Sequence, residues 1–116
     1  MDVLLLHDPR EHPLDLFAAV AAAGHRVASH GGDADALPDF LAAMRWRPQA
    51  LVVDFRGRPA RALDVARRAA TSAPRARLVL VHVPASAREE AAGELPSARA
   101  AEDAAGVLDA LAAEGR

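Results

Sequence analysis

Short apolar runs alternate along the chain with segments whose apolar residues follow helical spacing. The strongest run is 51–55, which carries Asp54 near its end and is followed by the turn 56–59. A short apolar run between two helical patterns is typical of a strand buried on both faces of a parallel sheet. Ligands of such sheets gather at the carboxyl ends of the strands, so Asp54 is the first candidate for a functional residue.

The same pattern predicts four further strands. The chain opens with an apolar run at 3–6, which stops before Pro9, and a weaker run follows at 26–30. A second strong run covers 78–83 and is closed by Pro84. The segment 94–99 is predicted as a short fifth strand that Pro96 interrupts.

Helical segments lie between these strands. In the first of them, Leu14, Phe17, Ala18 and Ala21 follow the spacing of one helix face. Asp33 or Asp35 is a suitable cap for the second helix. The predicted helices are 13–23, from Asp33 or Asp35 to 47, 60–72, 86–92 and 102–113.

This alternation of strands and helices predicts one α/β domain over residues 1–116. Short connections call for right-handed crossovers, with helices on both faces of a single parallel sheet. For five strands the common arrangement is the doubly wound, flavodoxin-like order 2-1-3-4-5. That order brings the carboxyl ends of strands one, three and four together, and with them His7, Asp8 and Asp54.

Composition narrows the function classes. The hydrophobic fraction is 52% and the aromatic fraction 3%, so the core is expected to consist of Ala, Leu and Val. The chain has no Cys, which excludes disulfides and thiolate metal sites. No apolar run is long enough to span a bilayer, and no signal-peptide pattern opens the chain, so we expect a cytoplasmic protein.

Charge gives no reason to expect nucleic acid or membranes as partners. The net charge is −2, whereas such partners usually require a basic patch. All 14 basic residues are Arg, and nine of them fall between Arg45 and Arg77. We attribute the absence of Lys to a GC-rich genome.

The chain resembles a response-regulator receiver domain over nearly its whole length. The matching segments are 3–9, 47–54 and 77–83, and Asp54 lies about where such domains carry their phosphoacceptor aspartate. The resemblance implies that Asp54 takes a phosphoryl group from a histidine kinase. It also implies a Mg²⁺ ion held by Asp8, Asp54 and the backbone carbonyl of Arg56.

The chain departs from the pattern of that family at several positions. His7 stands where a second acidic residue is expected, and Pro84 stands at the position of the usual hydroxyl, with Ser86 close by. The family's lysine is missing; Ala100 falls at its position, and Arg99 is adjacent. The segment between strands four and five is also short, which predicts a shortened fourth helix.

These departures affect the groups that bind metal and the phosphoryl oxygens. We therefore expect a degenerate receiver, or pseudo-receiver, that binds a signalling protein without a standard phosphorylation cycle. It would be no enzyme, would bind Mg²⁺ weakly or not at all, and could form a homodimer. The alternative is a working receiver in which Asp54 is phosphorylated with Mg²⁺.

Three local alternatives remain open. His7, Asp8, Asp54 and His82 could converge on a transition metal, which mixed imidazole and carboxylate ligands suit. Arg56 and Arg58 are either solvated charges or partners that keep Asp54 neutralised. Trp46 either packs in the core or contacts a partner. The spacing from Asp8 to His12 resembles that of cobalamin-binding domains only faintly, because the rest of their motif is absent.

Overall fold

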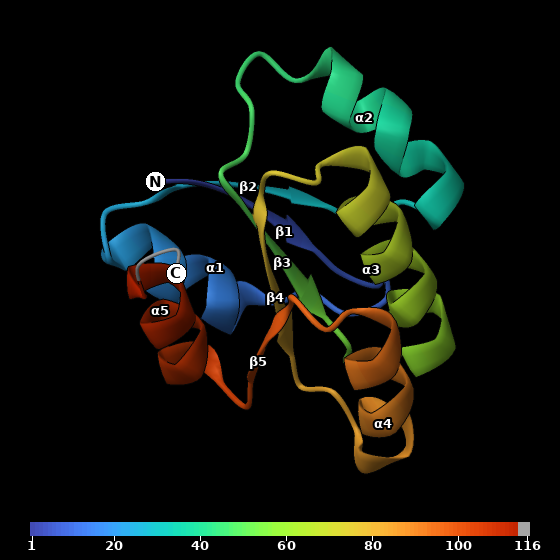
Figure 1. Cartoon of the computed structure of the whole chain (residues 1–116). Helices are drawn as coiled ribbons and strands as arrows, with labels where there is room; N and C mark the ends of the chain where they lie inside the picture. The colour runs from blue at the N-terminus through green and yellow to red at the C-terminus, as the bar shows by residue number, and fades with distance from the viewer. Residues whose placement is uncertain (114–116) are drawn as a thin grey trace.

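The computed structural model describes residues 1–113. Five parallel strands form one sheet in the order β2-β1-β3-β4-β5, which confirms the predicted fold class and strand order (Figure 1). The predicted domain range 1–116 ends with residues 114–116, which lie outside the described part. The strands are β1 (Asp2–Leu6), β2 (Arg26–His30), β3 (Ala50–Asp54), β4 (Arg77–Val81) and β5 (Arg99–Ala101).

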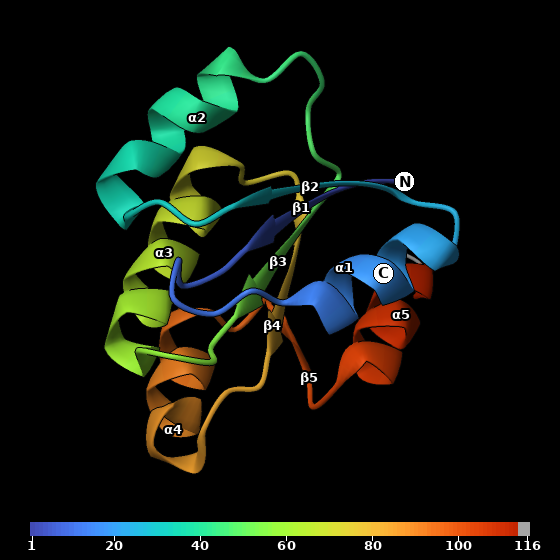
Figure 2. The ribbon, with the colours of Figure 1, turned by 180° about the vertical axis from the view of Figure 1, so that it is seen from behind.

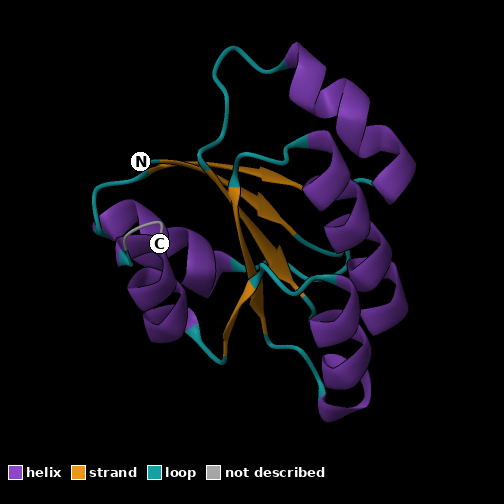
Figure 3. Ribbon diagram, in the orientation of Figure 1, coloured by secondary structure: helices purple, strands orange, loops and turns teal. Residues whose placement is uncertain are grey.

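Helices cover both faces of the sheet. In Figure 3 the strands form a middle layer between two groups of helices, and from behind α1 and α5 lie together on one face (Figure 2). Within residues 1–113 no helix combines the length and the apolar character needed to cross a membrane. The helices are α1 (Leu14–Ala22), a 3₁₀ turn (Ala34–Ala36), α2 (Leu37–Ala43), α3 (Pro59–Ser72), α4 (Ala85–Glu94) and α5 (Ala104–Ala112).

Side-chain alternation along the strands produces two cores. In β1, Val3 and Leu5 pack toward α1 and α5, whereas Leu4 and Leu6 pack toward α2, α3 and α4. All five residues of β3 are buried, as the run of apolar residues predicted. Because β3 is central and covered on both faces, its last residue, Asp54, is held at a fixed place on the carboxyl edge.

Helix α1 buries a different face from the one that its spacing suggested. Leu16 and Val20 are buried in the core, while Leu14 is 74% exposed and Phe17 is 38% exposed. The helix is apolar nearly all round, so periodicity predicted the helix without fixing which side faces the sheet. An exposed apolar strip therefore lies on the outside of the domain.

Helix α2 is shorter than predicted. The predicted second helix reached residue 47, but α2 ends at Ala43 because Met44 takes an extended conformation. Trp46, in the loop that follows, is half-buried, and the Arg26 guanidinium lies 4.7 Å from the centroid of its ring. Trp46 is thus held against β2 by a cation–π contact.

The prediction of a strand over 94–99 is wrong. Helix α4 continues to Glu94, and Leu95 is buried with Ala87 and Ala91, which precede it by eight and four residues on the same helix face. The strand begins only at Arg99, where the prediction ended it. Two alanines and one leucine give a weak helical signal, so the sequence pattern ended the fourth helix at residue 92, too early.

The imidazole of His30 packs at the end of β2 against Phe40 from α2. The ring centroids are 4.2 Å apart, and the His30 Nε2 is buried without a hydrogen-bond partner. Burial lowers the pKa of His30, and the positive charges of His7 and Arg61 lower it further. The folded state therefore favours the neutral imidazole.

We predict that acidification destabilises the fold through His30. A histidine whose pKa is lower when folded contributes stability above its unfolded pKa of about 6.5 and loses it as the pH falls below that value. Urea titrations on both sides of this pH should show a drop in unfolding free energy that is smaller in His30→Gln. Equal slopes for the wild type and His30→Gln would contradict the prediction.

Candidate functional site

Asp54 ends the central strand and is only 1% exposed, yet its carboxylate is fully engaged. The Arg56 guanidinium donates to Oδ2 of this carboxylate from Nε at 2.9 Å and from Nη2 at 2.7 Å, and its Nε also reaches Oδ1 at 3.1 Å. The Arg56 backbone N–H donates to the same carboxylate at 3.0 Å. Arg56 is therefore a bidentate partner that follows Asp54 by two residues in the same loop.

The same guanidinium reaches a second carboxylate. Arg56 donates to Asp15, in the first turn of α1, at 2.9 and 3.2 Å. Hydrogen bonds from Arg56 lower the pKa of Asp15, and the two carboxylates, Asp54 foremost, raise the pKa of Arg56. Arg56 thus ties the end of β3 to the start of α1.

Asp8, in the loop after β1, is 3% exposed and has its own arginine. The Arg58 guanidinium donates to it from Nε at 2.7 Å and from Nη2 at 2.9 Å, and the Arg10 backbone N–H donates at 3.0 Å. Hydrogen bonds from Arg58 and then Arg10 hold the pKa of Asp8 well below its usual range. Each of the two buried acids at this edge is therefore paired with one guanidinium.

Gly57 allows one short loop to serve both acids. Its φ is +99°, a conformation that side chains rarely adopt. A Cβ on Gly57 would lie 2.9 Å from the Asp8 Oδ2, so the loop passes directly over that carboxylate. The turn lets Arg56 bind Asp54 while Arg58 binds Asp8.

His7 faces the backbone of its own loop. Its Nδ1 lies 2.9 Å from the carbonyl oxygens of Asp8 and Glu11, so this nitrogen carries the hydrogen and donates. In residues 1–113 no three His, Cys, Asp or Glu side chains group in a way that could hold a metal ion. The alternative of a transition-metal site at His7, Asp8, Asp54 and His82 is thus not formed.

Ser86 and Arg99 do not join Asp54. Ser86 is exposed in the first turn of α4. Strand pairing sets Asp54 beside Val81 and Val81 beside Ala101, so Arg99 enters the sheet two residues earlier. Its side chain instead lines a hollow with Arg75 and Arg77, near the amino ends of the strands.

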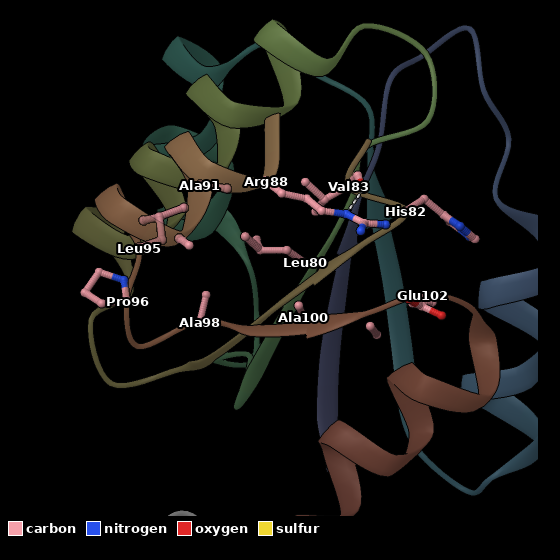
Figure 4. Close-up of a pocket in the computed structure, with 12 residues that line it drawn as sticks. Leu80, His82, Val83, Arg88, Ala91, Leu95, Pro96, Ala98, Ala100 and Glu102 are labelled. Carbon is pink, nitrogen blue, oxygen red and sulfur yellow. Dashed lines mark hydrogen bonds between the residues drawn. The ribbon is translucent and has the colours of Figure 1, made fainter. Parts of the chain in front are cut away.

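His82 takes the position directly after β4. Its φ is +60°, unusual for a residue other than glycine, and its Nε2 is buried without a hydrogen-bond partner. It lies at one end of a hollow of about 700 Å³ between α4 and strands β4 and β5. Figure 4 shows the His82 imidazole pointing away from Leu80 and Leu95. In the same hollow, Arg88 donates a hydrogen bond to the Val83 carbonyl at 3.3 Å. The sequence pattern had placed His82 inside the strand.

These carboxylates do not fit a Mg²⁺ site as they lie. Mg²⁺ requires octahedral oxygen ligands at close range, and both Asp8 and Asp54 already accept two side-chain hydrogen bonds from a guanidinium. A cation would have to displace Arg56 and Arg58 before it could reach them. The hypothesis that an arginine keeps Asp54 neutralised describes the observed contacts, and Arg58 does the same for Asp8.

Comparison with known proteins finds relatives of the fold alone. No family model and no curated protein matches the sequence. Among solved structures, a response regulator receiver protein from Burkholderia phymatum has a TM-score of 0.62 at 22% identity, over 85% of this chain and 78% of that one. The chain has the receiver-domain fold.

Two further structures show how far this similarity reaches. The receiver domain of a sensor histidine kinase from Pseudomonas aeruginosa, which has magnesium in its active-site cleft, matches at TM-score 0.65 and 17% identity, over 95% of this chain and 93% of that one. A de novo designed Rossmann 2x3 protein matches at TM-score 0.64 and 16% identity, over 95% and 85%. A designed protein without a natural history fits as well as a natural receiver, so the similarity concerns architecture.

We predict that Gly57→Ala destabilises the domain. A left-handed backbone costs a residue with a Cβ about 1–2 kcal/mol, and crowding against Asp8 adds to this. Gly93, exposed in α4, is the matched control, because a Cβ added there would meet no atom within 4 Å. Gly93→Ala should stabilise by about 0.5–1 kcal/mol. Urea unfolding of the two variants measures both effects; similar changes in both would contradict the assignment.

We predict that Arg58→Gln raises the pKa of Asp8. Without the guanidinium, the carboxyl should titrate nearer its ordinary value of about 3.9, and Arg58→Lys should give an intermediate value because one charge remains without the bidentate geometry. The contribution of Asp8 to stability is present above the unfolded pKa and lost as pH falls through the folded pKa, so the variant should lose stability at higher pH than the wild type. Carbon-13 NMR of the Asp8 carboxyl checks this; an unchanged titration would show that Arg58 is not the cause.

Proposed function

We propose that this domain is a receiver-like signalling module that acts by binding another protein, without a standard cycle of aspartate phosphorylation. One observation carries the proposal: the Arg56 guanidinium donates twice to Oδ2 of Asp54 and once, through its Nε, to Oδ1, at the position where the receiver pattern has its phosphoacceptor. The receiver fold supports a role in signalling, and the occupied carboxylate argues against the phosphorylation step.

The chemistry of phosphoryl transfer explains why this contact matters. An aspartate that attacks phosphorus needs a free lone pair, and the phosphate needs nearby cations that neutralise its oxygens. Here the guanidinium of Arg56 uses the lone pairs of Asp54 and shares its charge with Asp15. The chain has no lysine to contact the phosphoryl oxygens. Asp54 is therefore not free to attack phosphorus, and the chain has no lysine that could neutralise the phosphoryl oxygens.

The same contacts lead us to propose no resident cofactor. Any Mg²⁺ at Asp8, Asp54 and the Arg56 carbonyl would bind weakly, because it must first displace two bidentate arginines. We propose a role other than catalysis, in the cytoplasm, with a signalling protein as partner. As an alternative partner we propose a second copy of this chain, which would give a homodimer. We propose no binding to nucleic acid or membranes.

The test is an amide NMR titration with Mg²⁺ followed by beryllofluoride, a phosphoryl mimic. Wild type and Asp54→Asn should both remain unchanged at millimolar Mg²⁺, because Asp54 is already engaged. Mass spectrometry after incubation with acetyl phosphate should likewise show no phosphoryl group on the wild type.

Saturable shifts around Asp8 and Asp54 that vanish in Asp54→Asn would overturn the proposal and establish a working receiver. Arg56→Met serves as the informative variant, because it frees Asp54 without adding a charge. A response in Arg56→Met but not in the wild type would identify Arg56 as the group that blocks the site.

A further inference from the structure

The arginines of this chain divide into paired and unpaired groups. Within residues 1–113, six of them form ion pairs with carboxylates: Arg26, Arg56, Arg58, Arg61, Arg67 and Arg68. No carboxylate of the described residues lies within ion-pair distance of Arg47, Arg75 or Arg99. Arg77 donates to the backbone carbonyls of Ala110 and Leu111 at the end of α5. Arg10, Arg45 and Arg88 also form no ion pair within residues 1–113, so Arg47, Arg75, Arg77 and Arg99 are distinguished by their place in the fold and not by the lack of a carboxylate alone.

These four arginines meet at the amino-terminal edge of the sheet. Arg75, Arg77 and Arg99 line one hollow of about 570 Å³, and Arg47 and Arg75 line a second of about 490 Å³. The two hollows share Arg75 and Ala76, and we call them together the basic groove, defined by Arg47, Arg75, Arg77 and Arg99. No residue lining either hollow is acidic or aromatic.

The fold assembles this groove from distant segments. Strands β3, β4 and β5 run parallel, so the residues that precede or open them gather at one edge (Figure 1). Ala50 pairs with Arg77 at the start of β3 and β4, and Arg47 lies in the loop just before that point. This edge is opposite to the one that holds Asp8 and Asp54.

Prolines stiffen the rim of the groove. Pro48 follows Arg47, Pro74 precedes Arg75, and Pro96 lines the hollow next to Arg99. Each proline fixes its own φ and restricts the residue before it. Loops held in this way lose less backbone conformational entropy when a ligand binds.

We propose that the basic groove binds an acidic segment of a protein partner. The inference rests on the proposed function, because it names the chemistry of the partner and the surface that it occupies. Guanidinium forks match carboxylates in a bidentate geometry, as Arg58 shows at Asp8 and Arg56 at Asp15. Arg75 and Arg99 are exposed and offer the same forks outward.

The lining of the groove favours a peptide over a nucleic acid. Nucleic-acid grooves commonly add aromatic side chains on which bases stack, and the lining of this groove has none. A short run of Asp and Glu in a partner would supply the carboxylates that the exposed guanidinium groups of Arg47, Arg75 and Arg99 can bind.

The test is a titration of the full chain with a short poly-glutamate peptide, followed by amide NMR at about 0.1 M salt, where the Debye length is about 10 Å. We expect saturable shifts at Gln49, Arg75, Arg77, Ser97 and Arg99. The double variant Arg75→Gln/Arg99→Gln should bind about tenfold more weakly, because two exposed bidentate contacts are lost. Neither side chain makes a hydrogen bond within the described residues, so the variant should keep the wild-type fold, which its amide spectrum checks.

The matched control is Arg10→Gln/Arg88→Gln, which removes the same charge from other surfaces. It should change the affinity by about twofold at most, because exposed charges beyond a Debye length are screened. Absence of binding to the wild type, or equal weakening in both double variants, would overturn the proposal. Tighter binding of a short oligonucleotide through the same residues would overturn the choice of a peptide. Phosphorylation of Asp54 is measured in a separate experiment. The proposed function and the proposed acidic partner can therefore be rejected independently of each other.

Discussion

The carboxyl edge of this sheet depends on one electrostatic constraint: two buried carboxylates need positive charge close by. Removing a carboxylate from water without a partner costs several kcal/mol, so Asp8 and Asp54 could not stay ionised and buried if they were unpaired. The chain supplies the charge from its own loop 56–58. The path of that loop, the turn at Gly57 and the link from β3 to α1 all follow from meeting this requirement with two guanidinium groups.

The rest of the domain is a scaffold that fixes the positions of the two carboxylates and the two guanidinium groups. A sheet of Val and Leu lies between helices rich in Ala, and small side chains let the helices approach the sheet closely. The central position of β3 fixes Asp54 from both faces, whereas the edge strand β5 is short and its Arg99 and Ala100 are exposed. Rigidity is therefore greatest where the charges are buried and falls toward the edge of the sheet.

Local pattern predicted the strands β1 to β4 and placed Asp8 and Asp54 at their ends, and the common arrangement of five-stranded α/β domains then supplied the strand order. Arg56 lies two residues from Asp54, so its pairing could be stated as one of two alternatives. Arg58 lies 50 residues from Asp8, and no local signal joins them; only the packing of β1 beside β3 does. The face of α1 was ambiguous because its apolar residues surround the helix. The start of β5 was misplaced because Leu95 acts as the last anchor of α4, and the position of Arg99 was misjudged with it.

The cation at Asp54 is the guanidinium of Arg56, and this choice limits how the domain can transmit a signal. A guanidinium keeps its proton at every pH that a cell reaches, and Asp54 raises the pKa of Arg56 further. The Arg56 side chain therefore keeps its charge over that range, unlike a site whose acid alternates between a free and an occupied form. Under the proposed function, such a domain would not report its signal by changing form. Its partner would instead respond to the number of copies of the domain that the cell synthesises and degrades.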